Sequence, residues 1–169
     1  MFEKYGLSEA SFIEAGKQFF NEKGFEIQPY HHRVIVCVNL FEWDAVAYYL
    51  SKMHRRVDMI QHRDNYAAAG GFTMQYYHIG NGFNYTMLGL HGHTLKPCSH
   101  QKLVEFISVM AHEIQHVINH NARELKYNPV VEDEPVAYTV GMLTERVLGI
   151  VARSLNLSFI AMPRAAAYL

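Results

Sequence analysis

Hydrophobic residues recur at three- and four-residue steps along several stretches of the chain, a spacing that is typical of amphipathic helices. The longest stretch runs from 103 to 125, where Phe106, Met110, Ile114 and Val117 share one face and Ser99 is placed to cap the start. The same periodicity predicts shorter helices over 8–23, with Ser8 as N-cap, over 42–54 and over 133–152. These stretches are expected to form the helices of the fold.

Other stretches have the alternation or the β-branched content of strands. Residues 32–40 form a short run rich in valine and isoleucine, which predicts a strand covered on both faces. Residues 72–79 and 83–90 flank a Gly-Asn-Gly turn and predict a β-hairpin. Together the elements predict one α+β domain over 1–169, with helices and a small antiparallel or mixed sheet in 1–98, a helix pair in 99–152 and an apolar tail in 153–169.

The longest helix carries His112, Glu113 and His116 in the spacing H-E-x-x-H. Residues four apart lie on one face of a helix, so the two imidazoles can reach one metal ion about 2 Å away. A zinc ion with three protein ligands keeps a fourth position for water and lowers the pKa of that water towards about 7. Glu113, expected to point towards the same opening, would then act as the general base.

A third ligand is available at the start of the next predicted helix. Glu134 lies in an acidic cluster and is followed by Pro135, which suits the first turn of a helix and would fix Glu134 at its entrance. The alternative is that His112 and His116 are ordinary polar residues and that Glu134 is only a capping acid. The combination of all three residues favours metal binding over this alternative.

The pairing of HEIQH at 112–116 with EPVAY at 134–138 resembles the gluzincin branch of the zincin metallopeptidases, and more narrowly the short minimal gluzincins of phages and bacteria. The resemblance covers residues 99–151. It implies a zincin-like fold, Zn²⁺ as cofactor, His112, His116 and Glu134 as ligands and Glu113 as general base. It also implies that an edge strand upstream of the metal helix binds extended substrate by strand addition, a role expected here for residues 83–90.

Many gluzincins carry an aspartate four residues after the glutamate ligand, where this chain has Tyr138. Tyr138 is expected either to replace the hydrogen bond of that aspartate to a ligand histidine or to donate to a developing oxyanion. The alternatives are that Tyr138 is a plain core aromatic and that Glu132 or Asp133 orients His112. Three arginines are further candidates for a cation that stabilises the transition state: Arg123, Arg146 and Arg153. The sequence does not distinguish them from arginines that form ion pairs on the surface.

Other histidine arrangements can be compared with the sequence. The metzincin spacing would require glycine at 119 and histidine at 122, where the chain has Asn119 and Ala122, so that family is excluded. His120 lies two turns beyond the first motif histidine on the same helix. Residues four apart are progressively rotated around the helix axis, so three such rings cannot easily converge on one ion, and His120 is expected to be exposed rather than a ligand. His91 and His93 are candidates for an oxyanion donor or a second metal position, although solvated loop histidines are the favoured interpretation.

Composition limits the classes of binding partner and the cellular compartment that are expected for this protein. The 15 basic and 16 acidic side chains give a net charge of −1, which offers no electrostatic case for nucleic acid, so the basic stretch 52–63 is interpreted as a solvated helix end. The sequence has no basic-then-apolar leader and no membrane-length apolar run, which predicts a cytoplasmic protein, in the host cytoplasm if a phage encodes it. Cys37 is expected to be a small buried residue, and Cys98 to lie in a loop.

The sequence therefore predicts a zinc-dependent metallohydrolase, and most specifically a peptidase that acts on a peptide or protein substrate. An alternative from another class is a zinc-stabilised binding or assembly protein, such as a phage-encoded host-interaction protein, in which the same ligands hold the fold without turnover. A structural zinc is closed by four protein ligands, whereas a catalytic zinc keeps a water. A weaker third hypothesis is nucleic-acid association through 52–63, which would show as steeply salt-dependent binding.

Overall fold

The structure is a computed structural model, and it describes residues 1–27, 32–54, 70–78, 83–90, 100–126 and 133–155. Within these ranges it contains a short 3₁₀ helix, four α-helices and four strands, which confirms the predicted α+β class. Several predictions fall outside the described residues: the Ser99 cap, His91, His93, Cys98, the hairpin turn, most of the basic stretch and the tail from 156. In chain order the elements are η1 (Phe2–Tyr5), α1 (Glu9–Glu22), β1 (Gly24–Ile27), β2 (His32–Cys37), α2 (Leu40–His54), β3 (Gly71–His78), β4 (Phe83–Leu90), α6 (His100–Leu125) and α7 (Asp133–Leu155).

The four strands form one mixed sheet in the order β1-β2-β4-β3. β3 and β4 pair antiparallel, as the hairpin prediction requires, with Met74 opposite Met87. β2 and β4 are parallel, and β1, which the sequence analysis did not predict, pairs antiparallel with β2. β4 therefore lies inside the sheet with a neighbour on each side. The expectation that residues 83–90 form the substrate-binding edge strand is wrong, because β3 occupies that edge.

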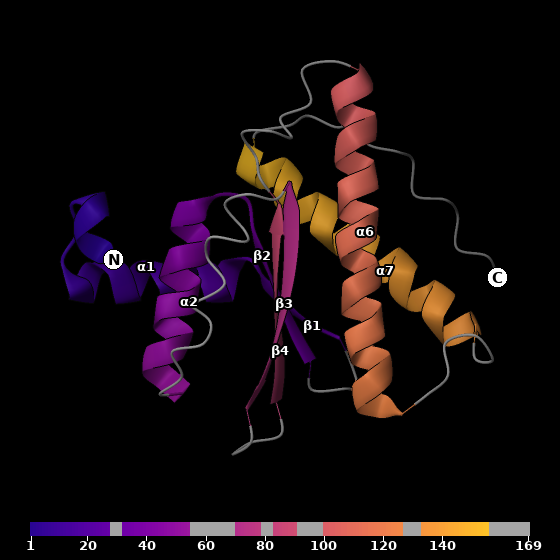
Figure 1. Ribbon diagram of the computed structural model, residues 1–169, viewed down its shortest axis with the longest axis horizontal. Helices are drawn as coiled ribbons and strands as arrows, with labels where there is room; N and C mark the ends of the chain where they lie inside the picture. Colours follow the sequence, from indigo (N-terminus) through magenta and orange to yellow (C-terminus); the bar gives the residue numbers. More distant parts are fainter. Residues whose placement is uncertain (28–31, 55–69, 79–82, 91–99, 127–132, 156–169) are drawn as a thin grey trace.

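Helices cover both faces of the sheet (Figure 1). α1 and α2 lie on one side, and α6 and α7 lie on the other. The alternation along β2 divides the core accordingly, since Val34 and Val36 pack towards α6 and α7 whereas Ile35 and Cys37 pack towards α2. The predicted strand covered on both faces is confirmed, and burial raises the pKa of the Cys37 thiol well above its ordinary value.

Helices α1 and α2 both start at identifiable N-terminal caps. The Ser8 hydroxyl accepts a hydrogen bond from the Ser11 amide at 3.2 Å, which confirms the predicted N-cap of α1. The start of α2 is fixed by Asn39, whose side-chain oxygen accepts from the Glu42 amide at 2.9 Å. The buried Glu42 carboxylate in turn accepts from the Val38 amide at 2.9 Å and from Lys23 at 2.6 Å.

None of the described helices combines the length and the apolar character needed to cross a membrane.

Candidate functional site

Helix α6 separates the motif histidines from the core. Its apolar residues at 106, 110, 114, 117 and 118 are almost fully buried against the sheet and α7, whereas His112 and His116 are exposed. The two imidazoles face each other across one helical turn, with 3.1 Å between their Nε2 atoms. The four-residue spacing therefore brings two nitrogen donors together on the solvent side of α6, as the sequence predicted.

The separation of these nitrogens can be compared with the needs of a metal ion. Two imidazoles bound at about 2.0–2.1 Å to a tetrahedral zinc place their nitrogens about 3.3 Å apart. The observed 3.1 Å is close to this value, and it is also the distance of a hydrogen bond between the two ring nitrogens. Among the described residues no group of three histidine, cysteine, aspartate or glutamate side chains converges as a metal site.

The third predicted ligand is placed only through its helix. Glu134 belongs to the first turn of α7 (Asp133–Leu155), and its side chain lies outside the described part of the structure. The side chain of Asp133 and all of Glu132 also lie outside it. The ligand role of Glu134 and the orienting roles considered for its two acidic neighbours therefore stay predictions.

Glu113 takes a position that differs from the expected one. It is only 5% exposed, although its neighbour His112 is exposed, because one residue step turns the side chain by about 100° around the helix axis. The Glu113 carboxylate lies against the edge strand, where Oε2 accepts a hydrogen bond from the Thr73 hydroxyl at 2.5 Å. The predicted opening shared with the histidines is not observed; the carboxylate contacts β3 beside them.

The expectation that His120 is exposed is wrong. Each four-residue step advances about 40° around a helix, so His120 is turned by about 80° from His112 towards the sheet. The His120 ring is partly buried, and its Nδ1 atom has no hydrogen-bond partner among the described residues. This desolvation, followed by the proximity of His116 and Arg123, lowers the pKa of His120.

A buried histidine that the sequence analysis did not single out lies between the sheet and α6. His32 on β2 has no exposed surface, and its Nε2 and Nδ1 atoms lie 2.7 Å from Thr86 Oγ1 and 3.3 Å from Asn121 Oδ1. Because an amide oxygen only accepts, Nδ1 donates to Asn121 and Nε2 accepts from Thr86. A polar residue at the first position of a predicted strand gave no signal of this role.

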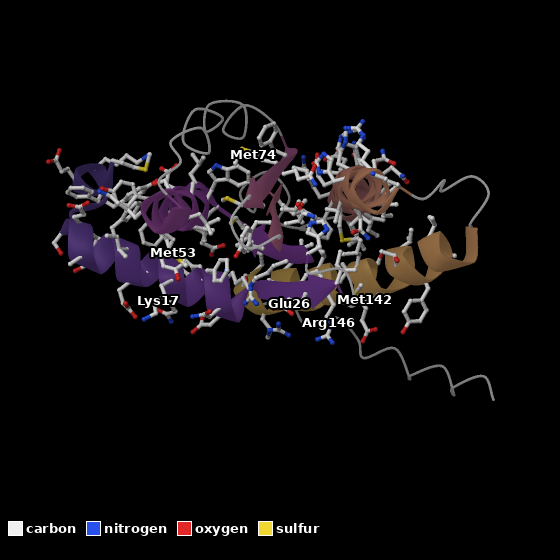
Figure 2. The ribbon with its side chains drawn as sticks, turned by 90° about the horizontal axis from the view of Figure 1, so that it is seen from below. Lys17, Glu26, Met53, Met74, Met142 and Arg146 are labelled. Atoms are coloured by element: carbon white, nitrogen blue, oxygen red, sulfur yellow. The ribbon has the colours of Figure 1, made fainter. Side chains whose placement is uncertain are left out.

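The remaining candidates from the sequence are dispersed. Tyr138 is 79% exposed on α7, so the alternative of a core aromatic is wrong, and its proposed hydrogen-bonding roles stay predictions. Arg146 and Arg153 line a cleft of about 330 Å³ formed with α1 and β1, and its described lining includes no residue of α6. In Figure 2, Arg146 is drawn below the ribbon of α7. Arg123 is exposed in the last turn of α6.

Comparisons of the chain with protein-family models, with curated proteins and with solved structures found no match. The functional interpretation therefore depends on the local geometry of α6 and β3. That geometry consists of a close pair of exposed imidazoles and a buried carboxylate held against an edge strand.

Proposed function

We propose that the protein is a zinc-dependent hydrolase, and most specifically a peptidase, in which His112, His116 and Glu134 hold the metal. The observation that carries the proposal is the 3.1 Å separation of the two Nε2 atoms on an exposed helix face, with the buried Glu113 next to His112 in the sequence. The 3.1 Å approach is also that of a hydrogen bond between one protonated and one unprotonated Nε2, and two ligands of one cation require a similar separation. The H-E-x-x-H spacing and Glu134 in the next helix support the same interpretation.

When bound, zinc would acidify a water molecule and polarise the carbonyl group of the substrate. The Glu113 carboxylate, which lies against β3, would accept the proton of that water where the water lies between the metal and β3. It would deliver this proton to the leaving amine, so that the water oxygen adds to the carbonyl carbon and the C–N bond breaks. β3 would orient the substrate, since β3 pairs with β4 on one side and lies at an edge of the sheet that the described strands form. Its outer backbone groups suit an extended peptide that pairs as an additional strand.

One observation favours a second candidate, a zinc-stabilised binding or assembly protein. Glu113 is buried and already hydrogen-bonded to Thr73, which is also the arrangement of a carboxylate that fastens α6 to β3 without taking part in turnover. The two candidates share the metal ligands and differ in the role of Glu113. An experiment must therefore measure metal binding and turnover separately.

Metal content tests the ligand set. Protein purified without added metal is analysed for zinc as wild type, His116→Ala, Glu134→Ala, Glu113→Gln and Gln115→Ala, where the last removes an exposed polar side chain of the same helix. We expect about one zinc per chain in the wild type, Glu113→Gln and Gln115→Ala, and loss of zinc from the two ligand variants. A wild type that stays free of zinc after zinc is offered would refute the metal site.

Turnover distinguishes the two candidates. The variants that retain zinc are incubated with a pooled library of internally quenched peptides. A peptidase loses at least about a hundredfold of its turnover in Glu113→Gln, because the general base is removed while the ligands remain. Zinc-loaded wild type that cleaves nothing in the library, or that cleaves no faster than Glu113→Gln, would favour the binding protein.

A further inference from the structure

The edge strand contains a notch that fits the carboxylate of Glu113. Gly71 and Thr73 are two residues apart on β3 and so face the same side of the sheet, towards α6. A Cβ atom at Gly71 would lie 2.8 Å from Glu113 Cγ, 2.9 Å from Glu113 Oε1 and 2.6 Å from Val109 Cγ1. Only a residue without a side chain leaves room for the carboxylate at this point.

Thr73 supplies the hydrogen-bond donor of this notch. Its hydroxyl lies 2.5 Å from Glu113 Oε2 and 3.3 Å from the Glu113 carbonyl oxygen. A hydroxyl has one proton, and the shorter distance is that of a charge-assisted bond to a carboxylate, so the proton is donated to Oε2. One carboxylate oxygen is thus bonded to Thr73 while the other lies over Gly71, which fixes both the position and the plane of the group.

We propose that Thr73 is the positioning residue for Glu113, and that Gly71 is the position whose missing side chain admits the carboxylate. This inference rests on the proposed function, since it concerns the general base of that site. His112 and Glu113 are consecutive on α6, so a carboxylate fixed against β3 is held at a fixed place relative to the ligand histidine. The strand proposed to bind substrate then also holds the general base, so β3 fixes the position of the base relative to the substrate.

Replacing the Thr73 hydroxyl tests whether Thr73 positions the Glu113 carboxylate for catalysis or only supports the fold. In Thr73→Val the buried carboxylate loses its donor and changes conformation, so we expect kcat for a cleaved quenched peptide to fall at least about tenfold. KM should stay within about twofold and zinc content should not change, because neither the ligands nor the outer backbone of β3 is altered. Thr73→Ser keeps the hydroxyl and should restore most of kcat.

A matched control and a second variant protect this test from a folding artefact. Thr144→Val makes the same chemical change on α7, where the hydroxyl donates to the Val140 carbonyl oxygen at 2.7 Å, and it should leave kcat unchanged. If Thr73→Val does not fold, Thr73→Ala removes the same donor with less bulk and serves in its place. Zinc content and far-UV circular dichroism verify each variant before kinetics.

The outcomes separate this inference from the proposed function. A drop in kcat for Thr73→Val and rescue by Thr73→Ser, with zinc retained, support the inference. If Glu113→Gln abolishes cleavage and Thr73→Val keeps wild-type kcat, or if Thr73→Val loses its zinc, the inference fails and the proposed hydrolase stands. If the wild type binds no zinc, or if no peptide is cleaved in a Glu113-dependent way, the proposed function fails and the inference fails with it.

Discussion

Protonation of His32 should couple the stability of this protein to pH. The His32 ring lies fully buried between β2, β4 and α6, and both of its nitrogens are used by neutral partners, Thr86 and Asn121. Burial lowers the pKa of His32 from 6.5 to about 4; the hydrogen bond to Asn121 opposes this shift and the nearby His120 adds to it. A second ring proton would turn Nε2 into a donor facing Thr86 and place a charge in the core.

The sign and size of the effect follow from linkage. Between pH 6.5 and pH 4 the unfolded chain holds the His32 proton and the folded chain does not, so stability is fully present above about pH 6.5 and is lost as the pH falls towards 4. Each pKa unit corresponds to about 1.4 kcal/mol, which gives a loss of about 2 kcal/mol by pH 5 and about 3 kcal/mol below pH 4. This is a large part of the stability of an ordinary domain.

The assay is urea unfolding at pH 7.5, 6.5, 5.5 and 5.0, with a chelator present so that metal binding does not contribute. His32→Gln has no titratable ring and should lose about 2 kcal/mol less than the wild type between pH 7.5 and pH 5.0. Thr144→Ala alters no titratable group, so it tests whether reduced stability alone changes the dependence of the unfolding free energy on pH. If wild type and His32→Gln lost the same unfolding free energy between pH 7.5 and pH 5.0, the reasoning would be refuted, because His32 would then protonate equally in the folded and unfolded states.

Two further predictions concern packing and buried polar contacts. A Cβ atom at Gly16 would lie 2.2 Å from the Ala45 carbonyl oxygen, so Gly16→Ala should separate α1 from α2 and destabilise the protein by more than about 2 kcal/mol. Gly141→Ala should stabilise α7 by about 0.5–1 kcal/mol, because the new methyl group meets no other described part of the structure within 4 Å. Calorimetry of both variants checks this, and a Gly16→Ala melting temperature equal to the wild type would contradict the close packing. Glu42→Ala should cost about 3 kcal/mol, since it leaves the Val38 amide and the Lys23 ammonium without their carboxylate; urea midpoints measure it, and a loss below about 1 kcal/mol would contradict the role of this buried pair.

The sequence by itself determined the elements whose signals are local. The four-residue periodicity located α6 and the Ser8 cap located the start of α1, because helix formation depends on neighbours within one or two turns. The aromatic and β-branched residues on either side of the glycine turn located the β3–β4 hairpin for the same reason. The spacing of His112 and His116 was enough to predict that their rings meet on one face, which the 3.1 Å separation bears out.

Only the tertiary structure decided which residues far apart in the chain come together. The order β1-β2-β4-β3 places β3 at the edge and β4 inside, and this order depends on a parallel pairing of β2 with β4 that no local pattern encodes. The contact of Thr73 with Glu113 joins residues 40 positions apart, and that of His32 with Asn121 joins residues 89 positions apart. Such contacts arise when α6 packs on the sheet, since packing fixes the rotation of the helix and so determines which polar side chains are buried against which strand.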